Sequence, residues 1–202
     1  MEQAAKMLQG LEHVFWIGGN TCAGKSTVAA LLAARFGFEI YHSDAHFTRH
    51  LQAAELSRQP MLYALQHDLE WNRWVGQLRG GVKARVWWAF YRQRFEMIVD
   101  DLKALRGKVI IAEGVDILPA EVMRLVAKER AAWLVPTRPF FEAHYGHREK
   151  LSDQADEQTW SFYEAMIGRI RADTQRLGLK LIEVDDRGAS EISEILVDHF
   201  GL

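Results

Sequence analysis

One stretch constrains this chain more than any other, the run GGNTCAGKST from Gly18 to Thr27. It fits the pattern G-x-x-x-x-G-K-[ST], and four residues stand at the fixed positions: Gly19, Gly24, Lys25 and Ser26. The apolar run at 13–17 before it predicts a short buried strand. Apolar residues at helical spacing follow it as far as Gly37, which is a natural helix end. The sequence therefore predicts a strand, a glycine-rich loop and a helix, in that order.

A loop of this kind is suited to binding phosphate groups. Glycines let the backbone curl so that successive N–H groups point at phosphate oxygens, and the helix N-terminus adds the positive end of a dipole. Lys25 is expected to reach the β- and γ-phosphates of ATP, and the Ser26 hydroxyl to bind Mg²⁺. We expect the whole loop to contact the nucleotide: Gly19, Asn20, Thr21, Cys22, Ala23, Gly24, Lys25, Ser26 and Thr27. Cys22 is interpreted as a small loop residue rather than a nucleophile.

Composition bounds the class of protein. The 202 residues, 49% of them hydrophobic, suffice for one domain with a buried core. A net charge of −2 argues against a nucleic-acid partner, and a single cysteine excludes an internal disulfide. No secretory signal and no apolar stretch of membrane-spanning length is visible. We expect a cytoplasmic protein without a membrane partner, and the oligomeric state stays open.

Strand and helix patterns alternate along the chain. Strands are predicted at 13–17, 38–42, 108–112, 132–135 and 179–184. Helices are predicted at 61–78, ended by Gly80 and Gly81, and then at about 87–105, at 119–130, from Pro139, from a cap at Ser152 or Asp153 to Gly178, and from a cap at Ser190. This order predicts an α/β fold with a five-stranded parallel sheet and helices on both faces.

In such a sheet, ligands bind at the carboxyl ends of the strands. The glycine-rich loop follows the first predicted strand, and Asp44 follows the second. Glu113 and Gly114 follow the third, and Arg138 follows the fourth. Because these ends meet at one edge of the sheet, we expect their side chains to share a site.

On these residues the chain resembles the P-loop small-molecule kinases, the group that contains shikimate kinase, gluconate kinase, chloramphenicol phosphotransferase and the zeta-toxin kinases. The resemblance covers nearly the whole chain in element order. At residue level it covers the loop, Asp44, Glu113-Gly114 and the basic residues after the fourth strand. It implies a single P-loop kinase domain at 1–202, with a helical acceptor-binding insertion at 47–107 and a lid at about 137–155. The insertion is unusually long and rich in tryptophan.

The resemblance also implies roles. Lys25, Asp44, Arg138 and Arg148 are expected to be catalytic, with Asp44 accepting a proton from the attacking hydroxyl or orienting it. Asp44, Glu113 and Gly114 are expected to bind the acceptor, and Ser26 and Glu113 to hold Mg²⁺. The adenine is expected near 185–189. The alternatives are a turn residue for Asp44, an exposed strand-end carboxylate for Glu113, and solvated surface residues for the two arginines.

Charge gives a hint about the acceptor. Residues 45–107 carry 10 Lys and Arg against 6 Asp and Glu, although the whole chain is negative. This favours an anionic acceptor. Trp71, Trp74, Trp87 and Trp88 lie in the same region, where they can stack on a base, although their helical spacing favours a core role.

The expected function is therefore ATP- and Mg²⁺-dependent transfer of a phosphoryl group to a small, anionic acceptor. Two alternatives stay open. One is a nucleoside monophosphate kinase of the same fold. The other is a nucleotide-binding module or ATPase without a small-molecule acceptor.

Overall fold

The computed structural model describes residues 10–105, 107–149 and 156–202, with the backbone alone at 147–149. Its centre is one sheet of five strands: β1 Val14–Gly19, β2 Glu39–His42, β3 Ile110–Glu113, β4 Ala131–Pro136 and β5 Lys180–Val184. The strand order is β2-β3-β1-β4-β5, and every neighbouring pair is parallel. The predicted five-stranded parallel sheet is confirmed.

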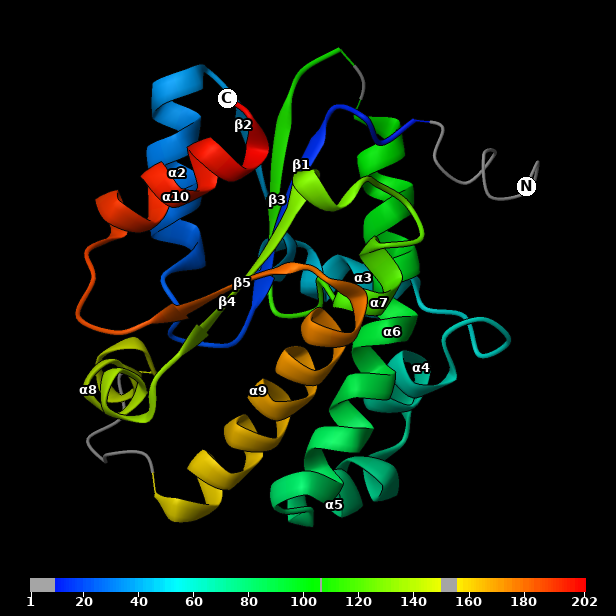
Figure 1. Ribbon diagram of the computed structural model, residues 1–202. Coiled ribbons are helices and arrows are strands. Elements are labelled where there is room, and N and C mark those ends of the chain that lie inside the picture. The colour runs from blue at the N-terminus through cyan, green and yellow to red at the C-terminus, as the bar shows by residue number, and fades with distance from the viewer. Residues whose placement is uncertain (1–9, 106, 150–155) are drawn as a thin grey trace.

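Helices cover both faces of this sheet (Figure 1). One face carries α2, Lys25–Phe36, and α10, Ala189–Phe200. The other carries α6, Gly80–Ala104, α7, Pro119–Val122, and α9, Glu157–Leu177. Side chains of a strand alternate between the faces, so Phe15 packs with the α2 and α10 layer while Trp16 packs with the α6 and α9 layer. Burial on both sides explains why the inner strands β1, β3 and β4 are nearly continuous apolar runs, whereas the edge strands β2 and β5 are partly exposed.

The connection between β2 and β3 is entirely helical except for short turns. After the short 3₁₀ helix η1, Ser43–His46, come α3, Phe47–Ala53, α4, Pro60–His67, α5, Leu69–Gln77, and α6. The predicted single helix at 61–78 is wrong, because Asp68 interrupts it and its carboxylate accepts a hydrogen bond from the Trp71 backbone N–H at 2.9 Å. Asp68 thus caps α5.

Two further helix predictions are wrong at their ends. Gly80 and Gly81 begin α6 instead of ending the helix before it, and Gly80 has a positive φ of 49°. The helix predicted at 119–130 ends at Val122, and a 3₁₀ turn, η2 at Lys128–Arg130, leads into β4. At both points the helix ends in a turn or a very short element. Apolar residues at helical spacing do not show there which residue begins or ends a helix.

The helices after β4 differ from the prediction mainly in their caps. Helix α8 spans Arg138–Glu149, with Pro139 in its first turn. The predicted caps Ser152 and Asp153 lie outside the described residues, and Asp156 caps α9 by accepting from the Thr159 backbone N–H at 2.7 Å. Ser190 lies inside α10, whose cap position is Gly188. No helix in the described part of the chain is long and apolar enough to span a bilayer.

Candidate functional site

The glycine loop, Gly18–Thr27, leaves the carboxyl end of β1 in a conformation that its glycines make possible. A Cβ atom on Gly18 would lie 2.2 Å from Trp133 Nε1, and one on Gly19 would lie 1.9 Å from the Leu134 carbonyl oxygen. Gly19 and Gly24 also have positive φ angles, 132° and 70°. Side chains are excluded at the first two positions, so the loop backbone packs directly on β4.

Lys25 and the loop hold each other in place. The Lys25 ammonium donates to the Asn20 carbonyl oxygen at 2.7 Å, and the side chain is buried. The Asn20 side chain accepts from the Thr21 backbone N–H at 2.7 Å and donates to the Tyr163 carbonyl oxygen at 3.0 Å. The last contact ties the loop to α9. The cation is therefore positioned inside the curl of the loop, where phosphate oxygens are expected.

Ser26 and Glu113 come together at the start of α2. The Ser26 hydroxyl donates to Glu113 Oε1 at 2.9 Å, and His42 Nδ1 lies 2.7 Å from the same oxygen. Glu113 ends β3 and is the register partner of His42 on β2, while its carboxylate is buried. A hydroxyl and a carboxylate oxygen side by side are ligands suited to Mg²⁺. Among the described residues no group of three or more histidine, cysteine and acidic side chains is placed to hold a metal ion by itself.

Asp44 and Gly114 lie at adjacent strand ends. Asp44 is exposed in η1, directly after β2, and Gly114 follows β3. A Cβ atom on Gly114 would lie 1.8 Å from Ser43 Oγ, so only glycine allows the two strand ends to approach this closely. The structure therefore brings Asp44, Gly114, Glu113 and the glycine loop to one edge of the sheet, as predicted from the strand order.

A buried ion pair beneath this edge was missed from the sequence. Arg94 of α6 pairs with Asp116 and also donates to the Ser43 carbonyl oxygen, and both side chains are almost wholly buried. Burial raises the pKa of Asp116, and the Arg94 charge opposes that rise. The pair holds η1, and hence Asp44, against the segment after β3. An arginine inside the apolar stripe of α6 is the sequence signal that could have revealed it.

The two arginines predicted for the lid have different outcomes. Arg138, at the start of α8, forms ion pairs with Glu142 at 2.8 Å and with Glu157 at 2.6 Å. Its guanidinium also lies 5.4 Å from the centre of the Trp160 ring. In this arrangement Arg138 ties α8 to α9 and does not contact the glycine loop. The side chain of Arg148 lies outside the described residues.

Two hollows border the glycine loop. The larger, about 640 Å³, is lined by loop residues from Cys22 onwards and by Phe140, His144, Arg187 and Ala189. It includes the region expected to hold adenine, and the rings of Phe140 and His144 stack there at 4.0 Å. The second, about 410 Å³, lies between Gly19–Thr21 and helices α6, α8 and α9. Both volumes are in the range of small-molecule sites, and the loop separates them.

Solved structures with a similar fold include a shikimate kinase from Acinetobacter baumannii in complex with shikimate. Its TM-score is 0.56 at 14% identity, over 96% of this chain and 95% of that chain. A shikimate kinase from Aquifex aeolicus matches with TM-score 0.50 at 17% identity, covering 93% and 96%. A protein from Thermus thermophilus matches with TM-score 0.52 at 19% identity, covering 92% and 94%. The chain has the P-loop kinase fold. No protein-family model matches the sequence, and no curated protein matches it either.

The P-loop kinase fold accounts for the placement of the site. The glycine loop follows the carboxyl end of β1, the central strand of the sheet. Glu113 and Asp44 lie at the ends of β3 and β2 on one side of it. At identities of 14–19% the likeness concerns the fold and leaves the acceptor to be argued from the side chains.

Proposed function

We propose that the protein is an ATP- and Mg²⁺-dependent phosphotransferase that moves the γ-phosphoryl group of ATP to a hydroxyl of a small, anionic molecule. The observation that carries the proposal is the contact of Ser26 with the buried Glu113 carboxylate, at 2.9 Å, beside a loop that separates two hollows of ligand size. A donor nucleotide and an acceptor can then approach the same loop from two sides.

The residues divide the work as follows. The glycine loop and Lys25 bind the phosphates, and the larger hollow receives the nucleoside. Ser26 and Glu113 would hold Mg²⁺, which would supply positive charge to offset the negative charge of the phosphates. The acceptor oxygen forms a bond to the γ-phosphorus while the bond to the β-γ bridging oxygen breaks, and ADP leaves. Asp44 accepts the hydroxyl proton.

Residues 47–107 form the acceptor-binding part of the proposed kinase domain, and residues at about 137–155, of which 150–155 lie outside the described residues, form its lid. Closure of this lid would exclude water, which otherwise competes with the acceptor for the phosphoryl group. Gly114 allows the ends of β2 and β3 to lie close together where the acceptor is proposed to bind, because a side chain at Gly114 would collide with Ser43.

The first test replaces Lys25. Lys25→Met is expected to abolish phosphotransfer from labelled ATP to a metabolite pool. The methionine side chain is of similar length, but it lacks the positive charge that binds the phosphates. Lys128→Met, on the exposed 3₁₀ turn before β4, is the matched control and should keep full activity. Thermal melts check that both variants fold. A fully active Lys25→Met protein would remove the basis of the proposal.

The second test concerns the proton. Asp44→Asn keeps the shape of the side chain but cannot take up a proton, so turnover should fall by about 10²–10⁴-fold. ATP affinity, measured separately by calorimetry, should change little. If ATP affinity collapses instead and turnover of bound substrate stays normal, Asp44 serves the nucleotide or the fold rather than the acceptor.

A further inference from the structure

The second hollow, which we name the aromatic hollow, has a distinctive lining. Five aromatic side chains line it: Trp87 and Tyr91 from α6, Tyr145 from α8, and Phe162 and Tyr163 from α9. The glycine loop closes one end at Gly19–Thr21, and the beginning of α6 forms the other. Resting on the proposed function, we propose that this hollow binds the acceptor and that the acceptor is a flat aromatic ring bearing an anionic group.

The aromatic side chains form a connected and well-packed wall. Phe162 and Tyr163 meet edge to face at 4.9 Å, Tyr145 and Tyr163 meet at 5.7 Å, and Trp87 lies 5.8 Å from Tyr91. Phe141 packs behind them, 4.8 Å from Tyr163. Packing of this kind holds the rings in fixed orientations. A flat ligand ring can therefore stack or pack edge-on against a surface that is already formed.

Polar side chains of the lining, among them Asn20, Thr21 and Thr159, come from the glycine loop and the beginning of α9, and the ring faces of the aromatic wall offer a polyhydroxylated ligand no hydrogen bonds. Each hydroxyl that a ligand buries needs a hydrogen-bond partner, and ring faces supply none. An aromatic ligand has no such demand. Against the five rings of this wall, a flat aromatic ring is therefore favoured over a saturated polyol of the same size.

Positive charge lies at the α6 end of the hollow. Lys83, in the first turns of α6, places its ammonium 5.4 Å from the centre of the Phe162 ring. No carboxylate in the described part of the chain forms a salt bridge with Lys83. Arg79 lies beside it and donates to the carbonyl oxygens of Gly76 and Leu78, which orients its guanidinium. Asp156 is the acidic side chain of this lining, and it caps α9. A ligand anion next to the ring would therefore meet Lys83.

The test compares three probes of similar size. 4-(Hydroxymethyl)benzoate has a flat ring, a carboxylate and a hydroxyl, shikimate has a puckered polyol ring and a carboxylate, and benzyl alcohol has the flat ring without the charge. Binding is measured by calorimetry and ligand-observed NMR with the nucleotide site filled by a non-hydrolysable ATP analogue and Mg²⁺. We expect 4-(hydroxymethyl)benzoate to bind at least tenfold more tightly than either of the others. Shikimate binding as tightly or more tightly, or no binding of any aromatic probe, would overturn the proposal.

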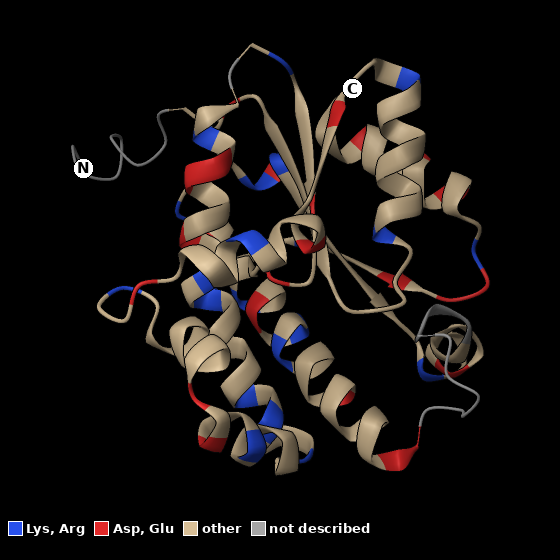
Figure 2. Ribbon diagram, turned by 180° about the vertical axis from the view of Figure 1, so that it is seen from behind, with Lys and Arg blue, Asp and Glu red and all other residues tan. Residues whose placement is uncertain are grey.

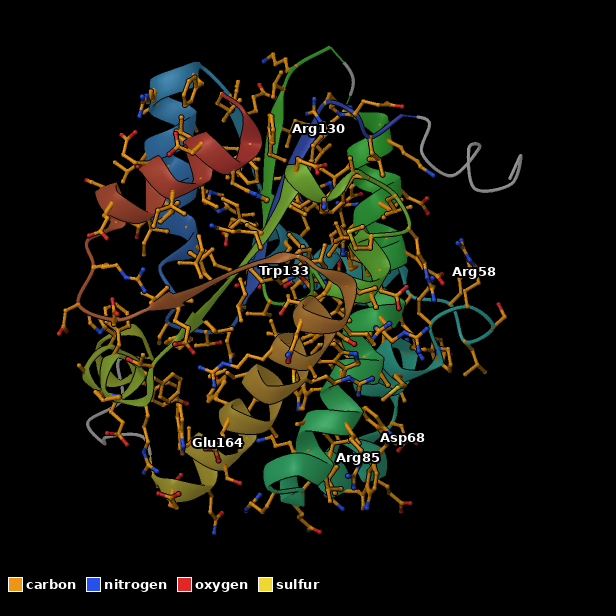
Figure 3. All side chains as sticks on the ribbon, viewed as in Figure 1. Arg58, Asp68, Arg85, Arg130, Trp133 and Glu164 are labelled. Carbon is orange, nitrogen blue, oxygen red and sulfur yellow. The ribbon has the colours of Figure 1, made fainter. Side chains whose placement is uncertain are left out.

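Variants locate the binding. Lys83→Met should weaken 4-(hydroxymethyl)benzoate about tenfold and leave benzyl alcohol unchanged, and Phe162→Leu should weaken both. The matched control is Arg85→Met. Two residues along a helix turn by about 200°, so Arg85 points away from Lys83, and Figure 3 shows it at the end of the molecule that carries α5. Equal losses in Lys83→Met and Arg85→Met would contradict a specific site. Lys83→Met is a surface change, so the test holds even if Phe162→Leu folds poorly.

An aromatic anion can come from two sources. A fourth probe, AMP, is added with the ATP analogue still bound. Binding of AMP that exceeds that of the benzoate and depends on Lys83 and Phe162 supports the proposed chemistry and assigns the ring to a nucleobase. The reverse order also supports it and assigns a simple aromatic acid.

Failure here and failure of the proposed function are distinguishable. Transfer of label from ATP to shikimate that needs Lys25, without transfer to either aromatic probe, would leave the phosphotransferase standing and end the aromatic proposal. Aromatic binding that depends on Lys83, together with transfer that is indifferent to Lys25→Met, would leave the aromatic binding site standing and remove the basis of the proposed phosphotransferase.

Discussion

Arg94 carries a full positive charge into the apolar layer between α6 and the sheet. Its side chain is 1% exposed and Asp116 is 0% exposed, so neither charge has water to solvate it. The guanidinium also lies 5.1 Å from the centre of the Phe47 ring. Such pairs contribute little net stability, but breaking one leaves an uncompensated buried charge. The pair therefore acts mainly by fixing η1 next to the site.

We expect Arg94→Met to lower the free energy of unfolding by about 3–5 kcal/mol near pH 8. Without Arg94, the strongest influence that opposes burial is lost, so the pKa of Asp116 rises further above its ordinary value. A carboxyl whose pKa is raised in the folded state is least costly when protonated, so the deficit should shrink as pH falls towards 5. Urea unfolding at pH 5 and pH 8 measures both. A deficit that is larger at pH 5 would contradict the assignment.

Two variants complete the comparison. Arg92→Met, two residues earlier on α6, removes an exposed partner of Glu121 and should change stability by less than about 1 kcal/mol. The double change Arg94→Met with Asp116→Leu removes both buried charges and should recover most of the loss. Turnover of the double variant then reports the positioning role of the pair apart from its effect on stability.

At this scale the sequence predicted what depends on local spacing. Gly19, Gly24, Lys25 and Ser26 follow from a motif, and the structure places them in one loop. The Arg94–Asp116 pair joins residues 22 positions apart and depends on how α6 packs, which no local pattern records. Ser26 and Glu113 are 87 positions apart, and their contact was expected only because strand ends meet at one edge of the sheet and because the resemblance gives both residues to Mg²⁺.

Among the elements, α8 and α9 are joined by ring packing between Phe141 and Tyr163 and, at the surface, by the exposed side chain of Arg138. Arg138 pairs with Glu142 on its own helix and with Glu157 at the start of α9. If Arg138 is to reach the transferred phosphoryl group, it must first leave Glu157. Exposed ion pairs of this kind contribute about 0–1 kcal/mol, so this release is energetically accessible.

We expect Arg138→Ala to lower turnover about tenfold with ATP affinity nearly unchanged, and Glu157→Gln to leave turnover equal or higher because it frees Arg138. Arg35→Ala is the matched control, since Arg35 forms an ion pair of 2.6 Å with Glu194 between α2 and α10 at similar exposure. Steady-state kinetics of the three variants measure these effects. An equal loss of turnover in Arg138→Ala and Glu157→Gln would show that Arg138 only ties the helices together.

Helices and strands were predictable where burial of one or both faces fixes the spacing of apolar residues along the chain. The three inner strands are buried along their whole length, and the edge strands β2 and β5 still carry apolar residues, so the existence of all five strands followed from the sequence. The helical connection between β2 and β3 was harder, because Asp68, Gly80 and Gly81 fit both the end of one helix and the beginning of the next. Capping geometry, such as the bond from the Trp71 N–H to Asp68, decides between these possibilities.

Over the whole molecule, charge is distributed unevenly. The net charge is −2, which by itself would repel an anionic acceptor. Figure 2 shows Lys and Arg gathered at the end of α5 and α6, where Arg73, Arg79, Lys83 and Arg85 are found. Arg79 and Lys83 line the aromatic hollow at this end. Attraction of an anion into the hollow must therefore come from Arg79 and Lys83 and not from the molecule as a whole.

This distribution predicts a dependence on salt. The screening length falls from about 30 Å at 0.01 M to about 8 Å at 0.15 M ionic strength, so distant basic residues lose their influence on an approaching anion. With Mg-ATP saturating, kcat/KM for an anionic acceptor should fall several-fold over this range, mainly through a higher KM. Benzyl alcohol, a neutral acceptor, should show little change, which separates acceptor attraction from general salt effects on the enzyme. An equal dependence for the two acceptors would mean that the basic residues of α5 and α6 are only a solvated surface, and Arg73→Met would then be without effect on either.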